Sequence, residues 1–136
     1  MLLTKECDYA IRIVQKLSSL DDGLNQETVS TICDSEHIPV SFAYKILMKL
    51  KKAGIVSSVR GMAGGYLLSK APDSISVFDV LRAVDANLFI NECLKPGHAC
   101  QNNDSRSTPC NMRCVLEQLQ DNFVSTLSQT TITQIL

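Results

Sequence analysis

Residues 41–66 read SFAYKILMKLKKAGIVSSVRGMAGGY, and this stretch decides the fold. At about 100° per residue, its first half predicts an amphipathic helix over residues 41–53 that ends at Gly54. Apolar side chains share one face of this helix: Ala43, Ile46, Leu47, Leu50 and Ala53. The opposite face carries Ser41, Tyr44, Lys45, Met48 and Lys52. Two such faces are typical of the recognition helix of a helix-turn-helix, which enters the major groove of DNA.

The second half of the stretch predicts a β-hairpin. Two β-prone runs, at residues 55–59 and 66–69, flank a glycine-rich turn at residues 61–65. A hairpin directly after two helices makes the frame a winged helix. Arg60 lies at the base of the expected wing, where a guanidinium can reach a phosphate or a narrow minor groove. The turn lacks the Lys-Ser/Thr ending of a nucleotide-binding loop, so we do not interpret it as one.

The flanking sequence completes a mainly α fold with a small β-hairpin wing. Upstream, helices are predicted over residues 4–20, with Thr4 as N-cap, and over residues 26–35, capped by Asn25. Downstream, Ser76 is expected to cap a short helix over residues 77–86, and a long helix to span about residues 109–130. The apolar stripe of that long helix is Met112, Leu116, Leu119, Phe123 and Leu127.

The long terminal helix predicts a homodimer. After a small DNA-binding module such a helix is commonly a dimer seam, and the alternative is that it folds back on its own domain. We therefore expect one compact unit with three parts: a winged helix-turn-helix over residues 1–86, a cysteine-bearing sensor loop over residues 87–108 and a dimerisation helix over residues 109–136.

Charge distribution points to a polyanion as partner. The 136-residue chain has a net charge of −1, yet no Asp or Glu lies between residues 37 and 72, where six Lys and Arg residues fall. A solvated lysine-rich helix is the alternative.

We expect a cytoplasmic protein, because the chain has neither an apolar run of about eighteen residues nor a signal-peptide pattern. Neither a Ser/His/Asp set nor paired carboxylates stand out, so we expect no enzyme and no small-molecule substrate.

Six cysteines form two groups. Cys7 and Cys33 fall in predicted helices and are interpreted as small buried hydrophobes. The other four, Cys93, Cys100, Cys110 and Cys114, are separated by gaps of six, nine and three residues. Structural zinc usually takes two Cys-x₂₋₄-Cys pairs, and only the last gap fits. Disulfides are disfavoured in a reducing compartment, whereas an iron–sulfur cluster accepts irregular spacings. Spacing alone leaves a cluster, zinc and redox-active thiols open.

Three motifs resemble the Rrf2 family of bacterial regulators: Leu3-Thr-Lys-x-x-Asp8-Tyr-Ala, Ala53-Gly-Ile-Val-Ser-Ser-Val-Arg-Gly, and Gly64-Gly-Tyr-Leu-Leu. The resemblance covers essentially the whole chain and is most specific at the wing. It implies a homodimer that binds a double-stranded DNA operator through winged helices. It also implies a transcription regulator that senses iron–sulfur status, redox state or nitric oxide through a cluster held by cysteines in the loop.

Residue by residue, the resemblance implies that Cys93, Cys100 and Cys110 are the three loop ligands. Cys114 stands where iron–sulfur-regulating members have a histidine ligand, and the gap before Cys110 is longer than usual. Both departures leave the cluster type open, with 2Fe–2S favoured over 4Fe–4S. Asp8, which matches a ligand that the partner subunit donates in nitric-oxide-sensing members, and His98 are alternative ligands.

On the DNA side, Ser41, Tyr44 and Lys45 match the start of the family's recognition helix, and Arg60 matches its wing arginine. Lys52 and Gly64 complete the predicted DNA-binding set. Two alternatives stay open: a cluster-free regulator of the same fold that responds to thiol oxidation or a partner protein, and a small redox carrier. The basic helix and the wing argue against the carrier, which needs neither.

Overall fold

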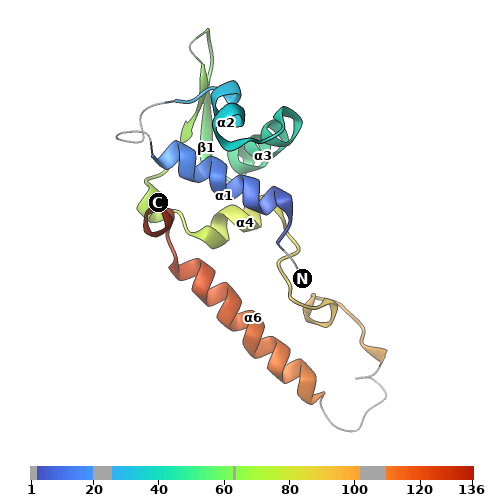
Figure 1. The fold of residues 1–136 in the computed structure, drawn as a ribbon. Helices are drawn as coiled ribbons and strands as arrows, with labels where there is room; N and C mark the ends of the chain where they lie inside the picture. Colours follow the sequence, from blue (N-terminus) through green and yellow to red (C-terminus); the bar gives the residue numbers. More distant parts are fainter. Residues whose placement is uncertain (1–2, 20–25, 63, 102–109) are drawn as a thin grey trace.

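The computed structural model describes residues 3–19, 26–62, 64–101 and 110–136. Figure 1 shows a helical domain with a β-hairpin at one end and one long helix that extends away from the other end. The elements are α1 (Lys5–Ser18), α2 (Val29–Glu36), α3 (Val40–Lys52), β1 (Val56–Val59), β2 (Gly65–Leu68), the 3₁₀ turn η2 (Pro72–Ser74), α4 (Val77–Val84), the 3₁₀ turn η3 (Glu92–Leu94), α6 (Asn111–Gln129) and the 3₁₀ turn η4 (Ile132–Ile135). The predicted fold class, a mainly helical winged helix, is confirmed.

The first two helices begin at side-chain caps. The Thr4 side-chain oxygen accepts a hydrogen bond from the Cys7 amide at 3.3 Å, so the predicted cap of α1 is confirmed. The second helix begins later than predicted: Thr28 caps α2 by accepting from the Thr31 amide at 3.1 Å. The reason is that Glu27 pairs through its backbone with β2 and is therefore extended. Asn25 lies outside the described residues.

Helix α3 divides between core and solvent as its sequence predicts. Ala43, Ile46, Leu47 and Leu50 are fully buried. Ala53 is exposed, contrary to expectation, because the helix ends at Lys52 and Ala53 is the C-cap. The core also includes the two cysteines predicted to be buried, Cys7 and Cys33.

The wing is a two-stranded hairpin extended by one bridge. Val56 lies opposite Leu68, and Val59 opposite Gly65. The Glu27 amide donates to the Tyr66 carbonyl at 2.9 Å, and the Tyr66 amide donates to the Glu27 carbonyl at 2.8 Å. A Cβ atom on Gly65 would collide with the Glu27 carbonyl, so this close pairing requires glycine.

The chain returns to the helical domain after α6. The Ile132 amide donates to the Ile75 carbonyl at 2.9 Å, and the Val77 amide donates to the Thr130 carbonyl at 2.8 Å. Ile132 is fully buried in the core. Helix α4, between these contacts, begins at the predicted Ser76 cap and ends at Val84, two residues earlier than expected.

Helix α6 has no buried residue in the chain as described. Phe123 and Leu127, near its C-terminal end, pack against the core, while its N-terminal half extends away from the helical domain beside residues 87–101 (Figure 1). Only one end of α6 therefore folds back on its own domain. No helix in the described parts of the chain combines the length and apolarity needed to cross a bilayer.

Candidate nucleic-acid interface and cysteine segment

The outer face of α3, formed by Ser41, Tyr44, Lys45, Met48 and Lys52, is exposed along its length. Tyr44 is 53% exposed and Met48 69% exposed. The buried face holds the helix against the domain, so the outer side chains are free to meet a ligand. This is the arrangement that a recognition helix requires.

Two lysines of α3 are tied to a carboxylate on α1. The Lys49 ammonium lies 2.7 Å from the Glu6 carboxylate oxygen and also donates to the Val84 carbonyl at 2.9 Å. Lys45 lies 3.7 Å from the same Glu6 oxygen. Glu6 is largely shielded, with 18% of its side chain exposed, whereas Lys45 keeps 60%. Lys49 is thus committed to holding three helices together, and Lys45 remains accessible.

The other cations near the wing have different surroundings. Lys51 donates to the Ser58 hydroxyl at 2.6 Å and thereby joins the end of α3 to β1. Lys52 and Arg60 are exposed, and within the described residues neither has a hydrogen-bond or ion-pair partner. These two charges are available to a polyanion.

Gly64 shapes the turn of the wing. Its amide donates to the Gly61 carbonyl at 3.0 Å, and a Cβ atom at this position would collide with the carbonyls of Val59 and Gly61. The turn therefore closes only over glycine. Its tip carries Met62, whose side chain is fully exposed.

Residues 87–101, here called the cysteine segment, are clamped to α6. The Gln120 side chain accepts from the Ile90 amide at 2.9 Å and donates to the Leu88 carbonyl at 2.8 Å. Cys93 lies in η3, which contacts α6, and Cys110 is the N-cap of that helix. This clamp was not predicted, because a glutamine in a long helix gives no signal of its partner.

All six cysteines are free thiols. Cys93, Cys100 and Cys110 are half-buried, and Cys114, in the first turn of α6, is exposed. The described residues contain no group of three or more His, Cys, Asp or Glu side chains arranged to hold a metal ion. The structure thus leaves the predicted four-cysteine set unassembled, with residues 102–109 between Cys100 and Cys110 outside the described parts.

A cation that sequence analysis missed lies near two of these thiols. Arg113 donates to the Glu117 carboxylate at 2.9 Å, and this hydrogen bond is the main cause that raises the pKa of Arg113. Negative charge at Cys93 and Cys100 acts in the same direction. The only sequence signal was a basic residue placed between Cys110 and Cys114.

The alternative ligands, Asp8 and His98, belong to no group of three or more potential metal ligands among the described residues. Asp8 is exposed and pairs with Arg12, whose nitrogen lies 3.2 Å from the carboxylate. His98 is exposed in the cysteine segment, where its charge, after the hydrogen bond and the charge of Lys95, helps to lower the pKa of Glu92. The other histidine, His37, is exposed and caps the C-terminal end of α2 in the left-handed conformation with φ 54°.

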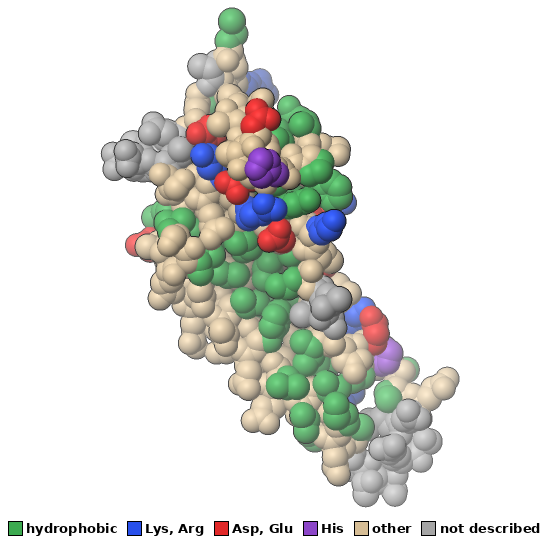
Figure 2. Space-filling model, in the orientation of Figure 1, with side chains coloured by type: hydrophobic (Ala, Val, Ile, Leu, Met, Phe, Trp, Pro, Cys, Tyr) green, Lys and Arg blue, Asp and Glu red, His purple; other side chains and the backbone are tan. Residues whose placement is uncertain are grey.

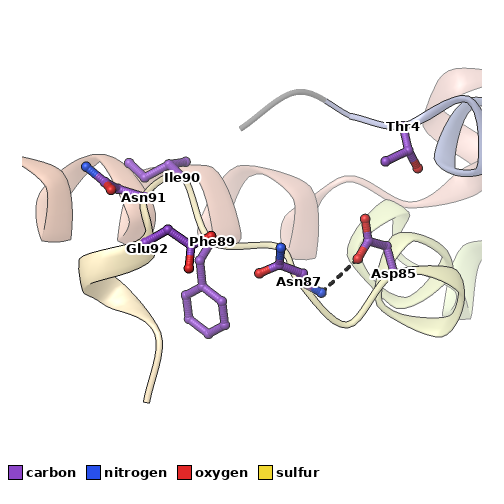
Figure 3. Close-up of a pocket in the computed structure, with 7 residues that line it drawn as sticks. All are labelled: Thr4, Asp85, Asn87, Phe89, Ile90, Asn91 and Glu92. Carbon is purple, nitrogen blue, oxygen red and sulfur yellow. Dashed lines mark hydrogen bonds between the residues drawn. The ribbon is translucent and has the colours of Figure 1, made fainter. Parts of the chain in front are cut away.

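A hollow of about 380 Å³ lies where the cysteine segment begins. Thr4 faces it from the start of α1, and the Asp85–Glu92 stretch supplies the other lining residues (Figure 3). The Asp85 carboxylate accepts from the Asn87 amide at 2.8 Å. The hollow therefore lies between the N-terminal end of α1 and the start of the cysteine segment.

An apolar stripe on α6 is open to solvent. Met112 is 59% exposed, and Val115 and Leu119 are each 51% exposed. Their spacing of three and four residues places them on one side of the helix. Figure 2 shows hydrophobic side chains on the elongated lower part of the molecule, where α6 lies. A stripe of this kind marks a contact surface.

Comparisons with known proteins agree with this architecture. The family model described as "Iron-dependent Transcriptional regulator", Rrf2, matches residues 3–136. The helix-turn-helix-type transcriptional regulator IscR of Enterobacter sp. (strain 638) is 33% identical over 139 residues, covering 99% of this chain and 79% of the relative. IscR of Klebsiella pneumoniae (strain 342) is 37% identical over 123 residues, covering 88% and 72%. The global cysteine regulator CymR of B. subtilis superimposes with a TM-score of 0.80 at 20% identity, covering 99% of this chain and 95% of that chain.

Proposed function

Since the chain belongs to the Rrf2 family of transcriptional regulators, we propose that it binds operator DNA as a homodimer under the control of an iron–sulfur cluster. The proposed ligands are Cys93, Cys100, Cys110 and Cys114. One observation carries the proposal: the same chain presents an exposed recognition helix and a cysteine segment clamped to the helix that carries the open apolar stripe.

The protein is a DNA-binding transcription regulator, as its family and relatives establish. We assign the DNA contacts to six residues: Ser41, Tyr44, Lys45, Lys52, Arg60 and Gly64. The hydroxyl groups of Ser41 and Tyr44 can donate to base edges or phosphates, while the cations supply the phosphate contacts. Exposure of the outer face of α3 and the unpaired Lys52 and Arg60 support this assignment.

The donor chemistry supports a cluster. Four thiolates are a complete ligand set for 2Fe–2S, which we favour, or for 4Fe–4S. Arg113, between Cys110 and Cys114 in the sequence, would offset part of the negative charge of an anionic thiolate site. The family description ties its members to iron. A bound cluster would supply iron that oxidants, nitric oxide or iron shortage can alter. Asp8 of the partner subunit and His98 remain alternative ligands.

Residues of the chain itself connect the cysteine segment to the recognition helix. The segment begins just after Val84, whose carbonyl accepts from Lys49 of α3. Lys49 in turn pairs with Glu6, two residues after Thr4, which lines the hollow at the start of the cysteine segment. A change in the course of the cysteine segment therefore displaces groups that fix the position of α3. The coupling is a difference in DNA affinity between two states of the protein.

The proposed homodimer interface is the α6 stripe of Met112, Val115 and Leu119. A second copy of α6 packed on this stripe would bury side chains that are now half exposed. The resulting dimer would carry two recognition helices, as a two-fold symmetric operator requires.

The test of the cluster is anaerobic reconstitution with iron and sulfide, followed by operator binding. We expect visible absorption, bound iron and labile sulfide, and different DNA affinities for the coloured and colourless forms. A Cys93→Ser variant should lose the colour, whereas Cys33→Ser, outside the proposed site, should keep it. Protein that retains no iron would contradict the proposal and favour direct thiol oxidation. Equal affinity of both forms would disprove the switch.

The test of the dimer is a charge placed in the α6 stripe. Leu119→Glu should shift the sedimentation coefficient from dimer to monomer. Gln118→Glu, on an exposed part of the same helix outside the stripe, should leave the dimer intact. A dimer that survives Leu119→Glu unchanged would place the interface elsewhere.

A further inference from the structure

The recognition helix α3 exposes three large apolar or aromatic side chains to solvent. Val40 is 53% exposed, Tyr44 53% and Met48 69%. They recur at every fourth position, and Met48 lies near the middle of the outer face, between Ser41 and Tyr44 in angle. No neighbouring element covers these side chains in the described parts of the chain. A stripe that is exposed on the unbound protein is expected to meet a ligand with apolar groups.

The residue types of α3 restrict how it can read bases. From Val40 to Lys52 the helix contains no Arg, Asn, Gln, Asp or Glu. The hydrogen bonds of Arg to guanine and of Asn or Gln to adenine are therefore not available from it, which leaves Lys45 and Lys52 as the side chains that could reach guanine. Ser41 can contact any base, and Lys45, 3.7 Å from the Glu6 carboxylate, keeps 60% of its side chain exposed. The base feature that an apolar side chain recognises in the major groove is the methyl group of thymine.

We propose that Met48 and Tyr44 determine operator specificity by packing against thymine methyl groups in the major groove. This inference rests on the proposed function, because it requires that α3 enters the groove. Charge supports DNA as the occupant, since Lys45 and Lys52 lie beside the apolar stripe on α3 and both they and Arg60 of the wing are exposed. The thioether of Met48 is flexible and polarisable, which suits contact with a methyl group.

The experiment compares thymine with deoxyuridine, which lacks only the methyl group. A duplex sequence is first selected from a random pool with the full-length, anaerobically reconstituted protein. Thymines of the half-sites are then replaced by deoxyuridine, and Kd is measured at constant salt. We expect binding to weaken about fourfold for each contacted methyl group that is removed. Replacement of thymines outside the half-sites should leave Kd unchanged.

Variants assign the effect to the side chain. Met48→Gln should reduce the ratio of the deoxyuridine Kd to the thymine Kd toward one, while Met48→Leu should preserve that ratio. Lys52→Ala, on the same face, should weaken binding to both duplexes by the same factor. Both positions are exposed, so folding is expected to be unaffected.

The two levels of the proposal fail in different ways. A pool that yields no preferred sequence would overturn both sequence-specific binding and thymine reading. A preferred sequence that binds equally with thymine and deoxyuridine would overturn thymine reading alone. Thymine reading by these two side chains would also be overturned if the Met48→Gln and Tyr44→Ser variants both keep the full preference for thymine over deoxyuridine.

Discussion

Lys49 of the recognition helix and Glu6 of α1 form an ion pair with 2.7 Å between nitrogen and oxygen. The side chains are 34% and 18% exposed, so water screens the pair less than it screens a surface pair. The same ammonium holds the carbonyl of Val84, the last residue of α4. One lysine therefore fixes the recognition helix against the helix that begins the chain and the helix that leads to the cysteine segment.

Replacement of Glu6 by Gln should weaken the fold slightly and strengthen non-specific DNA binding. We expect the free energy of unfolding to fall by about 1 kcal/mol, because the charge on Lys49 loses its counterion. Lys45, no longer attracted to the carboxylate, becomes available to a phosphate, which should steepen the dependence of log K on log salt by about one unit. Urea unfolding and salt titrations of random-sequence DNA measure both effects.

The control for Glu6→Gln is Asp73→Asn, which changes the net charge equally at an exposed position. If Asp73→Asn steepens the salt dependence as much as Glu6→Gln does, the effect comes from overall charge and not from release of Lys45.

Replacement of Gln120 by Leu should loosen the cysteine segment. The variant loses the two hydrogen bonds that Gln120 makes to the Ile90 amide and the Leu88 carbonyl, at a cost of about 2 kcal/mol. Hydrogen–deuterium exchange should therefore accelerate in residues 87–101. Gln118→Leu, on an exposed position of α6, should not change that exchange rate. Equal exchange in both variants would mean that the clamp does not order the segment.

The six cysteines should divide sharply in their reactivity toward iodoacetamide. Cys7 is 1% exposed and Cys33 6% exposed. Burial and the neighbouring charge of Asp34 raise the pKa of Cys33, so at pH 8 it remains a protonated thiol and a weak nucleophile. In apoprotein both should be alkylated about tenfold or more slowly than the four cysteines of the proposed site.

Mass spectrometry after timed quenching measures the alkylation rates. In guanidinium chloride all six rates should converge, because burial is lost. Rapid alkylation of Cys33 in the folded protein at pH 8 would contradict the structure around α2.

A methyl group at Gly64 should disrupt the wing. Gly64→Ala brings a Cβ atom against the carbonyls of Val59 and Gly61, and we expect a loss of about 1–3 kcal/mol in the free energy of unfolding. DNA affinity should fall as well, because Arg60 loses its fixed position. Met62→Ala, in the same turn but fully exposed, should not change stability. Equal thermal stability of Gly64→Ala and the unmodified chain would mean that the turn relaxes freely.

Local periodicity was sufficient to predict the elements that bury one face. The alternation of buried and exposed residues in α3, the Thr4 and Ser76 caps and the hairpin all follow from short-range patterns. The start of α2 was predicted wrongly because the Glu27 backbone pairs with a strand almost forty residues away. No propensity of residues 25–28 reports that partner.

The site was predictable in composition and not in arrangement. Clustered cysteines predict a sensor segment, and that role stays a prediction, whereas the Gln120 clamp and the position of Arg113 depend on how the segment lies on α6. Likewise, the basic residues of α3 look equivalent in sequence, whereas Lys49 and Lys51 bind groups within the fold and Lys52 does not. Tertiary contacts, and not the residue type, therefore decide which of these lysines is bound within the fold.

The backbone pairing of residues 75–77 with residues 130–132 brings the chain back to the DNA-binding domain after the cysteine segment and α6. Ile132 fills the core of the DNA-binding domain, so that core is completed only when this part of the chain has returned. During synthesis, Ile132 becomes available to this core only when about forty-five residues beyond Ala86 have been made. If the cysteine segment misfolds so that Ile132 cannot return to its place, the core of the DNA-binding domain therefore lacks one of its buried side chains.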